Sequence, residues 1–190
     1  MRLRSFLWRI FAWLPACFAA WYGLAPLHAE AASRVSRAIL GLVEPNLVEN
    51  IERAGGLLSF VTTLEAVGPQ RGVLVMEVDA LLYTFGLPLF VALMLASRRG
   101  AAAMLLGALA LLPIQSAGIA LAFLVQLIGQ GTNVASVTGL AGWRAECLVL
   151  AYQFATLVMP AAAAILAWCA LSRDFIARLE WRGAAPPAPA

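Results

Sequence analysis

One thiol and one imidazole have the residue types that covalent chemistry at a membrane face would need. His28 is the only histidine, and Cys147 follows Arg144 and Glu146 at the start of an apolar segment. A cysteine thiolate activated by an imidazole, with an arginine nearby, serves as the nucleophile of a transpeptidase or protease. The negative charge of Glu146 opposes this reading, because it disfavours the thiolate. Cys147 and His28 therefore stand as an alternative catalytic pair, and no catalytic residue is assigned.

A second group of polar residues borders two apolar segments on what we predict to be the same side of a membrane. An ion pair between Arg144 and either Glu77 or Asp79 would fix the register of two helices, and a tryptophan at position 143 is typical of the membrane interface. A docking surface for another protein is the other interpretation. The candidate structural or interaction residues are Glu77, Asp79, Tyr83, Trp143, Arg144 and Glu146.

Uncharged polar side chains inside the apolar segments have two interpretations. They can form hydrogen bonds between transmembrane helices, or they can line a transport site. Because the last three apolar segments contain no Asp, Glu or Lys, ion-coupled transport is disfavoured. A small-molecule transporter is the third functional hypothesis. The residues are Gln115, Gln126, Tyr152, Gln153 and Thr156.

The three cysteines indicate neither a metal centre nor a disulfide framework. Cys17, Cys147 and Cys169 lie in or beside apolar segments, their number is odd, and no CxxC motif is present. Such cysteines behave as small core residues. We predict no metal and no cofactor.

Composition indicates an integral membrane protein. Apolar residues make up 63% of the 190 residues and charged residues only 12%, whereas a soluble domain is about half apolar and a quarter charged. The arginines are scattered rather than clustered in a stripe, which gives no support to nucleic-acid binding. We expect a single membrane domain over residues 1–190 that contacts the lipid bilayer.

Four apolar segments predict four transmembrane helices, at about 6–27, 80–96, 101–128 and 147–171. The first could also be a signal peptide, since Ala29-Glu30-Ala31 resembles a cleavage site after a basic start. Its tryptophans and its two prolines favour a retained anchor. The Ala- and Pro-rich tail, about 183–190, is predicted to be disordered.

The segment between the first two spans, about 28–79, is predicted to be an extracytoplasmic insertion. Apolar residues at helical spacing predict two short amphipathic helices between 31 and 58, divided by Pro45. Two β-branched runs, 58–67 and 73–78, flank the loop Gly68–Gly72 and predict a β-hairpin. The predicted fold class is an all-α polytopic membrane protein with an insertion of amphipathic helices and a hairpin.

The distribution of arginine predicts the orientation. Eight arginines lie at the amino terminus, in the short loop at Arg98–Arg99 and in the carboxy-terminal tail, whereas five are spread over the other side. Short cytoplasmic segments are enriched in basic residues. We therefore expect a protein of the bacterial inner membrane with both termini in the cytoplasm.

Several short motifs resemble a known family. They are Trp13-Leu14-Pro15-Ala16-Cys17-Phe18-Ala19-Ala20-Trp21-Tyr22, Leu81-Leu82-Tyr83-Thr84-Phe85-Gly86-Leu87-Pro88, Leu111-Leu112-Pro113-Ile114-Gln115, and Gly142-Trp143-Arg144-Ala145-Glu146 followed by Tyr152-Gln153. With them, most of the chain resembles the exosortase H-associated membrane proteins.

The resemblance implies an accessory role. Members of that family accompany an exosortase, which looks like a Cys/Arg/His membrane protease that sorts proteins carrying a carboxy-terminal signal, and this chain lacks the Cys-bearing motif of the exosortases. The first hypothesis is therefore a non-catalytic accessory or scaffold protein with an exosortase-type partner. The alternative is a membrane-embedded cysteine transpeptidase or protease in its own right.

Overall fold

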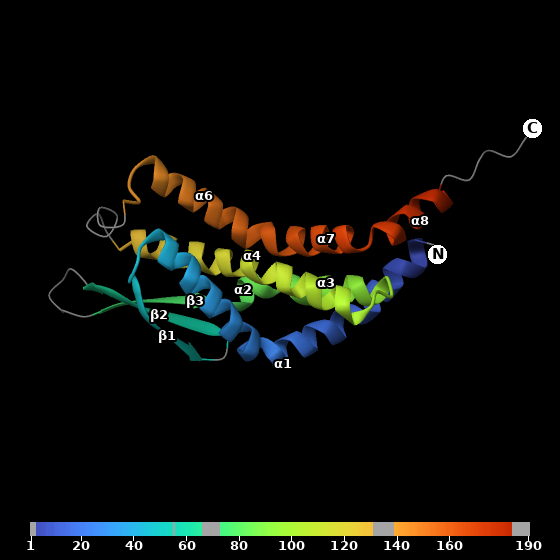
Figure 1. Ribbon diagram of the computed structural model, residues 1–190, viewed down its shortest axis with the longest axis horizontal. Helices are drawn as coiled ribbons and strands as arrows, with labels where there is room; N and C mark the ends of the chain where they lie inside the picture. The colour runs from blue at the N-terminus through green and yellow to red at the C-terminus, as the bar shows by residue number, and fades with distance from the viewer. Residues whose placement is uncertain (1–2, 55, 66–72, 131–138, 184–190) are drawn as a thin grey trace, which may run out of the picture.

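The computed structural model describes residues 3–54, 56–65, 73–130 and 139–183. It is an elongated helical bundle with a small sheet at one end, and both termini lie at the other end (Figure 1). The hairpin loop Gly68–Gly72 and residues 184–190 of the predicted tail fall outside the described residues. The helices are α1 (Leu3–Val43), α2 (Leu81–Thr84), α3 (Gly86–Ala96), α4 (Ala101–Ile128), α6 (Trp143–Leu157), α7 (Met159–Leu171) and α8 (Arg173–Gly183).

Two of the described helices, α1 and α4, are long and apolar enough to cross a membrane. The helices α6 and α7 form a pair bent by 61° at Val158, and they make a third candidate if they count as one broken span. The segment Leu81–Ala96 is apolar but shorter. All four predicted spans fall on helices, and two to three of them qualify as crossings by length and composition.

The helix α1 is longer than the sequence predicted. The segment after His28, predicted as the first separate amphipathic helix, continues α1 without a break to Val43. The two prolines inside it, Pro15 and Pro26, do not end the helix, although it is visibly curved (Figure 1). It ends just before Pro45, and the next residue, Asn46, takes a positive φ of 67°, which asparagine tolerates better than most residues.

The second predicted amphipathic helix, over about 47–58, is wrong. This segment forms strand β1 (Val48–Ala54), which pairs antiparallel with β2 (Leu57–Glu65). The predicted hairpin is confirmed as β2 and β3 (Val73–Asp79), also antiparallel, so the sheet has the order β1-β2-β3. Leu47, Val48 and Ile51 fit a helical spacing as well as a strand, and periodicity alone does not separate the two in so short a run.

One face of the sheet packs on the helices. The buried side chains Leu58, Phe60, Met76 and Val78 belong to the same core as Phe123 of α4. The rings of Phe60 and Phe123 lie 5.0 Å apart between centroids, a favourable distance for an aromatic pair. Because a two-stranded hairpin alone is marginally stable in water, this contact with α4 and the third strand explains why the insertion is ordered.

The helix α3 packs closely against the bend between α6 and α7. Gly86, the first residue of α3, lies so near Pro160 that a Cβ at position 86 would overlap the carbonyl oxygen of Pro160. Pro160 stands at the start of α7, a position where its missing N–H costs little. The contact therefore places α3 directly against the bend and requires a residue without a side chain.

Replacing Gly86 by Ala should destabilise the bundle, because the methyl group would meet backbone rather than a movable side chain. We expect a loss of about 1–3 kcal/mol, typical of overpacking, measured as a lower unfolding temperature in mild detergent. The matched control is Gly23→Ala, since a Cβ at Gly23 meets nothing within 4 Å and alanine favours a helix. Equal unfolding temperatures for the two variants would show that the Gly86 contact is not tight.

Candidate functional site

Charged residues gather at the two ends of the molecule. Counting only residues whose side chains the structure describes, the end that holds both termini carries six arginines with Asp174, and the sheet end carries four arginines with seven carboxylates. The arginines of the first end are Arg4, Arg9, Arg98, Arg99, Arg173 and Arg178. The carboxylates of the sheet end are Glu30, Glu44, Glu49, Glu52, Glu77, Asp79 and Glu146. The sheet end is thus the acidic end.

The long helix α1 holds the first strand in place through charged side chains. Glu30 forms ion pairs with Arg34, one turn later, at 2.8 Å and with Arg53 of β1 at 2.6 Å. Arg37 donates to the carbonyl oxygen of Glu49 at 3.0 Å and lies 3.5 Å from that of Val48. Two arginines and one glutamate therefore tie β1 to the part of α1 that extends beyond the predicted span.

The three candidate residues around the end of β3 have different environments. The side chain of Glu77 is exposed, and its carbonyl oxygen accepts a hydrogen bond of 2.9 Å from Gln126 of α4. The carboxylate of Asp79 accepts one of 2.9 Å from the backbone N–H of Leu81, at the start of α2. Tyr83 is buried beside Tyr152 and Thr156. Asp79 and Tyr83 therefore have structural positions, and Glu77 is the one of the three that faces outward.

The candidate residues at the start of α6 are exposed. The guanidinium of Arg144 lies 5.9 Å from the ring centroid of Trp143 and 3.5 Å from the carbonyl oxygen of Gly139. Glu146 is likewise exposed. The predicted ion pair of Arg144 with Glu77 or Asp79 is wrong, because in the part of the chain that the structure describes Arg144 turns back to its own helix start and forms no ion pair.

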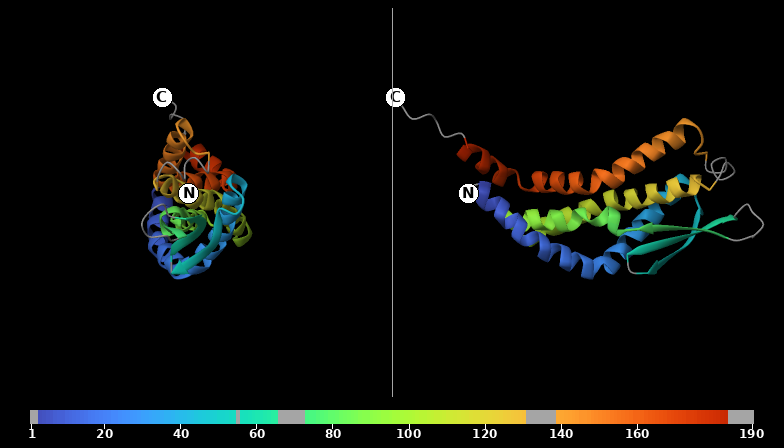
Figure 2. Two further views of the ribbon diagram at one scale, coloured as in Figure 1. Left: turned by 90° about the vertical axis from the view of Figure 1, so that its left-hand side faces the viewer. Right: turned by 180° about the vertical axis from the view of Figure 1, so that it is seen from behind.

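The structure does not bring His28 and Cys147 together. Nε2 of His28 donates to the side-chain oxygen of Gln115 in α4 at 2.8 Å, and Cys147 is exposed on α6, which lies on the other flank of α4 (Figures 1 and 2). No hydrogen bond joins the two residues in the described ranges. The geometry therefore does not make a nucleophile–base pair of His28 and Cys147.

The bond of His28 belongs to a set of polar contacts between helices. The amide nitrogen of Gln115 lies 3.5 Å from the carbonyl oxygen of Thr84 in α2, and the hydroxyl of Ser36 donates to the carbonyl oxygen of Ser116 at 3.0 Å. Gln115, Ser36 and Ser116 are buried. The interpretation of Gln115 as a link between helices is confirmed.

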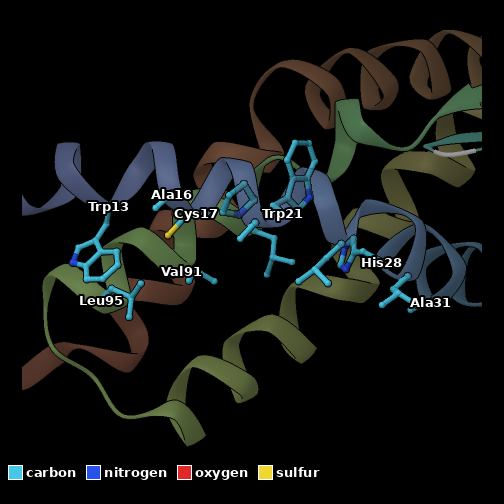
Figure 3. Close-up of a pocket in the computed structure, with 13 residues that line it drawn as sticks. Trp13, Ala16, Cys17, Trp21, His28, Ala31, Val91 and Leu95 are labelled. Atoms are coloured by element: carbon cyan, nitrogen blue, oxygen red, sulfur yellow. The ribbon is translucent and has the colours of Figure 1, made fainter.

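An apolar groove of about 670 Å³ runs between α1 and α3 (Figure 3). Its lining includes Trp13, Cys17, Trp21, Val91 and Leu95, with His28 at one end. The indole Nε1 of Trp21 is buried without a hydrogen-bond partner among the described residues. Apart from that imidazole, the thiol of Cys17 and the indole rings of Trp13 and Trp21, the lining is aliphatic, so the groove can hold an apolar chain.

Sequence reasoning missed the residues that protect the edges of the sheet. They include Arg37 and Asn50, whose side-chain oxygen accepts a 2.9 Å bond from the backbone N–H of Ile51. Gln126 was singled out from the sequence, but as a link between helices or part of a transport site and not as a cover for β3. No motif marks them, because their role depends on which strand lies at an edge. Across the described residues, no group of three or more His, Cys, Asp or Glu side chains could hold a metal ion.

Comparison with known proteins gives a family but no characterised relative. No curated protein matches the chain, and neither does any solved structure. The model of one family, described as exosortase H-associated membrane protein, matches residues 1–175, which include every helix down to the first turn of α8. The chain therefore belongs to the exosortase H-associated membrane protein family.

Proposed function

We propose that this protein is a non-catalytic accessory or scaffold subunit that binds an exosortase-type protease in the bacterial inner membrane and supports the sorting of surface proteins. Its family membership supplies the kind of partner. The observation that carries a binding role rather than a chemical one is the separation of His28 from Cys147. A membrane transpeptidase needs a nucleophile and a base within hydrogen-bond reach of each other.

The proposed contact surface is the sheet end, where polar side chains are exposed without serving the core. Trp143, Arg144 and Glu146 are exposed at the start of α6, and Glu77 is exposed on β3. Tryptophan and arginine are the residue types that most often dominate the energy of a protein interface. Lipid contact explains exposed apolar side chains along the helices but does not explain this mixture of acidic, basic and aromatic groups.

The proposed topology has four crossings, with both termini in the cytoplasm and the sheet outside. The successive connections support it because they alternate between the ends of the bundle: the sheet, the turn at Arg98–Arg99, the connection before α6, and α8 (Figure 2). The 16 residues of Leu81–Ala96 rise only about 24 Å, so the bilayer must thin locally or the arginines must extend to the headgroups. The arginine-rich end is the cytoplasmic one by the positive-inside rule.

Labelling of single cysteines tests this orientation. A variant that keeps Cys147 but carries Cys17→Ala and Cys169→Ala should react with a membrane-impermeant maleimide on intact cells whose outer membrane has been permeabilised. A variant with all three cysteines replaced and Arg173→Cys added should react only after the inner membrane is opened. The reverse pattern would invert the topology, and labelling of both from outside would contradict the four crossings.

Replacing Trp143 by Ala should reduce the amount of exosortase that co-purifies with the tagged protein from its native membrane. We expect a loss of about tenfold, as for a central interface residue, measured by quantitative mass spectrometry after mild detergent extraction. The matched control is Trp8→Ala, because Trp8 is exposed to 67% and Trp143 to 69% but they lie at opposite ends. If no exosortase co-purifies with the unchanged protein, the accessory role is wrong.

Replacing Cys147 by Ser should leave sorting unchanged, since the accessory role uses no thiol. His28→Ala should lower the abundance of the protein, because the buried amide of Gln115 loses its partner, while the sorting per molecule stays the same. Both are measured as the fraction of processed surface protein in cells where the variant replaces the original chain. Complete loss of sorting by Cys147→Ser at normal abundance would favour the transpeptidase alternative.

A further inference from the structure

We propose that the outer edge of strand β3, at Val73 and Val75, to which no described residue forms a hydrogen bond, binds an extended segment of a partner protein as a fourth strand. The expected segment carries apolar residues opposite Val73 and Val75 and a basic residue opposite Glu77. The proposal deepens the accessory role above, on which it rests only for the identity of the protein that supplies the strand.

Printed hydrogen bonds establish which backbone groups of β3 point outward. The carbonyl of Leu74 accepts from the hydroxyl of Thr62, and the N–H of Ala80 donates to Gly56, so the even-numbered residues face β2. The carbonyl of Glu77 accepts from Gln126 of α4 instead. Because N–H and C=O alternate sides along an antiparallel strand, the backbone groups of Val73, Val75 and Glu77 point away from the sheet.

The two edge strands, β1 and β3, differ in how many of their outward backbone groups form hydrogen bonds with side chains. On β1, Arg37 covers the carbonyls at the start of the strand, and the side chain of Asn50 occupies the outward N–H of Ile51. On β3, Gln126 occupies the carbonyl of Glu77. No hydrogen bond from a described residue reaches the outward groups of Val73 or Val75. Proteins usually protect such groups, because an open edge pairs readily with another strand.

The side chains at this edge define the chemistry of the added strand. Val73 is exposed to 53% and Val75 to 50%, and they share the outer face of the sheet with Glu77. Residues directly opposite on one face of a sheet stabilise it when both are β-branched or when their charges are opposite. A segment with a basic residue and two apolar residues at every second position satisfies all three side chains, and the excess of carboxylates at this end favours a basic strand.

A second copy of this chain is the other strand donor that chemistry allows, but it fits less well. Antiparallel pairing of two β3 edges around Val75 would place each Glu77 opposite a Val73, which leaves both carboxylates without a basic partner. Strand addition from a partner supplies backbone hydrogen bonds for affinity and side-chain pairs for specificity. The partner strand is therefore the occupant to which the proposal commits.

A direct binding measurement tests this. The full-length protein in nanodiscs is titrated with a fluorescent, acetylated peptide of sequence Arg-Thr-Val-Thr-Val-Thr, and binding is followed by anisotropy. Saturable binding is expected. The same peptide with N-methylated backbone amides should bind at least about tenfold more weakly, since each lost backbone bond weakens the complex. This control leaves the protein unchanged, so it does not depend on the folding of a variant.

Three variants locate the site. Val75→Pro removes an edge N–H that does not bond to β2, and proline is tolerated at strand edges, so binding should fall about tenfold, whereas Val75→Thr should bind within roughly threefold of the original. Glu77→Lys should reverse the preference, so that a Glu-Thr-Val-Thr-Val-Thr peptide binds better. Binding that is equal for the two peptide backbones, or equal for Val75→Pro and Val75→Thr, would overturn the proposal.

The test of strand addition can succeed or fail independently of the test of the accessory role. Peptide binding with the predicted pattern in a protein that captures no exosortase would leave strand addition standing and remove the proposed partner. Exosortase capture that is unaffected by Val75→Pro, together with an absence of peptide binding, would leave the partner and remove strand addition. A cross-linked dimer of this chain through residue 75 would assign the edge to a second copy and likewise overturn the proposal.

Discussion

Close packing against α4 is the interaction on which the other elements depend, because α4 touches α1, α2, α3, α6, α7 and β3. Where α4 crosses α2, Gly118 allows the ring of Tyr83 to approach so closely that a Cβ would lie 2.7 Å from its Cδ1. In lipid there is no hydrophobic force between helices, so such contacts and interhelical hydrogen bonds must supply the association. Gln115 and Ser116 supply those bonds next to Gly118.

The same helix connects the membrane part of the protein to the sheet. Its last turns bring Phe123 against Phe60, and Gln126 against the backbone of β3. From the other side, α1 reaches β1 through the ion pair of Glu30 with Arg53 and the hydrogen bond of Arg37 to the carbonyl oxygen of Glu49. The sheet therefore stands on two helices.

The sequence predicted those features that depend on composition over a long window. The predicted segment 101–128 has the same bounds as α4. A single long apolar segment can satisfy its own backbone hydrogen bonds in a bilayer only as a helix. The hairpin was predictable from its β-branched residues around a Gly/Pro loop. The structure of the segment after Pro45 was not predictable, since three apolar residues in a short polar run fit a helix and a strand equally. Its pairing with β2 makes it a strand.

The candidate site was predictable only in part. The residue types marked Trp143, Arg144 and Glu77 as exposed at one end, but the pairing of Arg144 depends on how α6 begins, and its first residues follow a glycine with a positive φ of 61°. Likewise, the single histidine suggested chemistry, and only the register of α1 against α4 shows that its partner is Gln115. Register between helices is set by side-chain packing, which periodicity does not encode.

The unbroken length of α1 has a geometric consequence for the sheet. Its 41 residues span about 60 Å, roughly twice the hydrocarbon thickness of a bilayer, so one helix sets both the distance of the sheet from the other end of the bundle and the direction in which the sheet faces. Each residue of a helix adds about 1.5 Å and about 100° of rotation. The length of α1 between His28 and Val43 therefore fixes the azimuth of the sheet, and a relative with one residue more or fewer there would present a different side of it to the same partner.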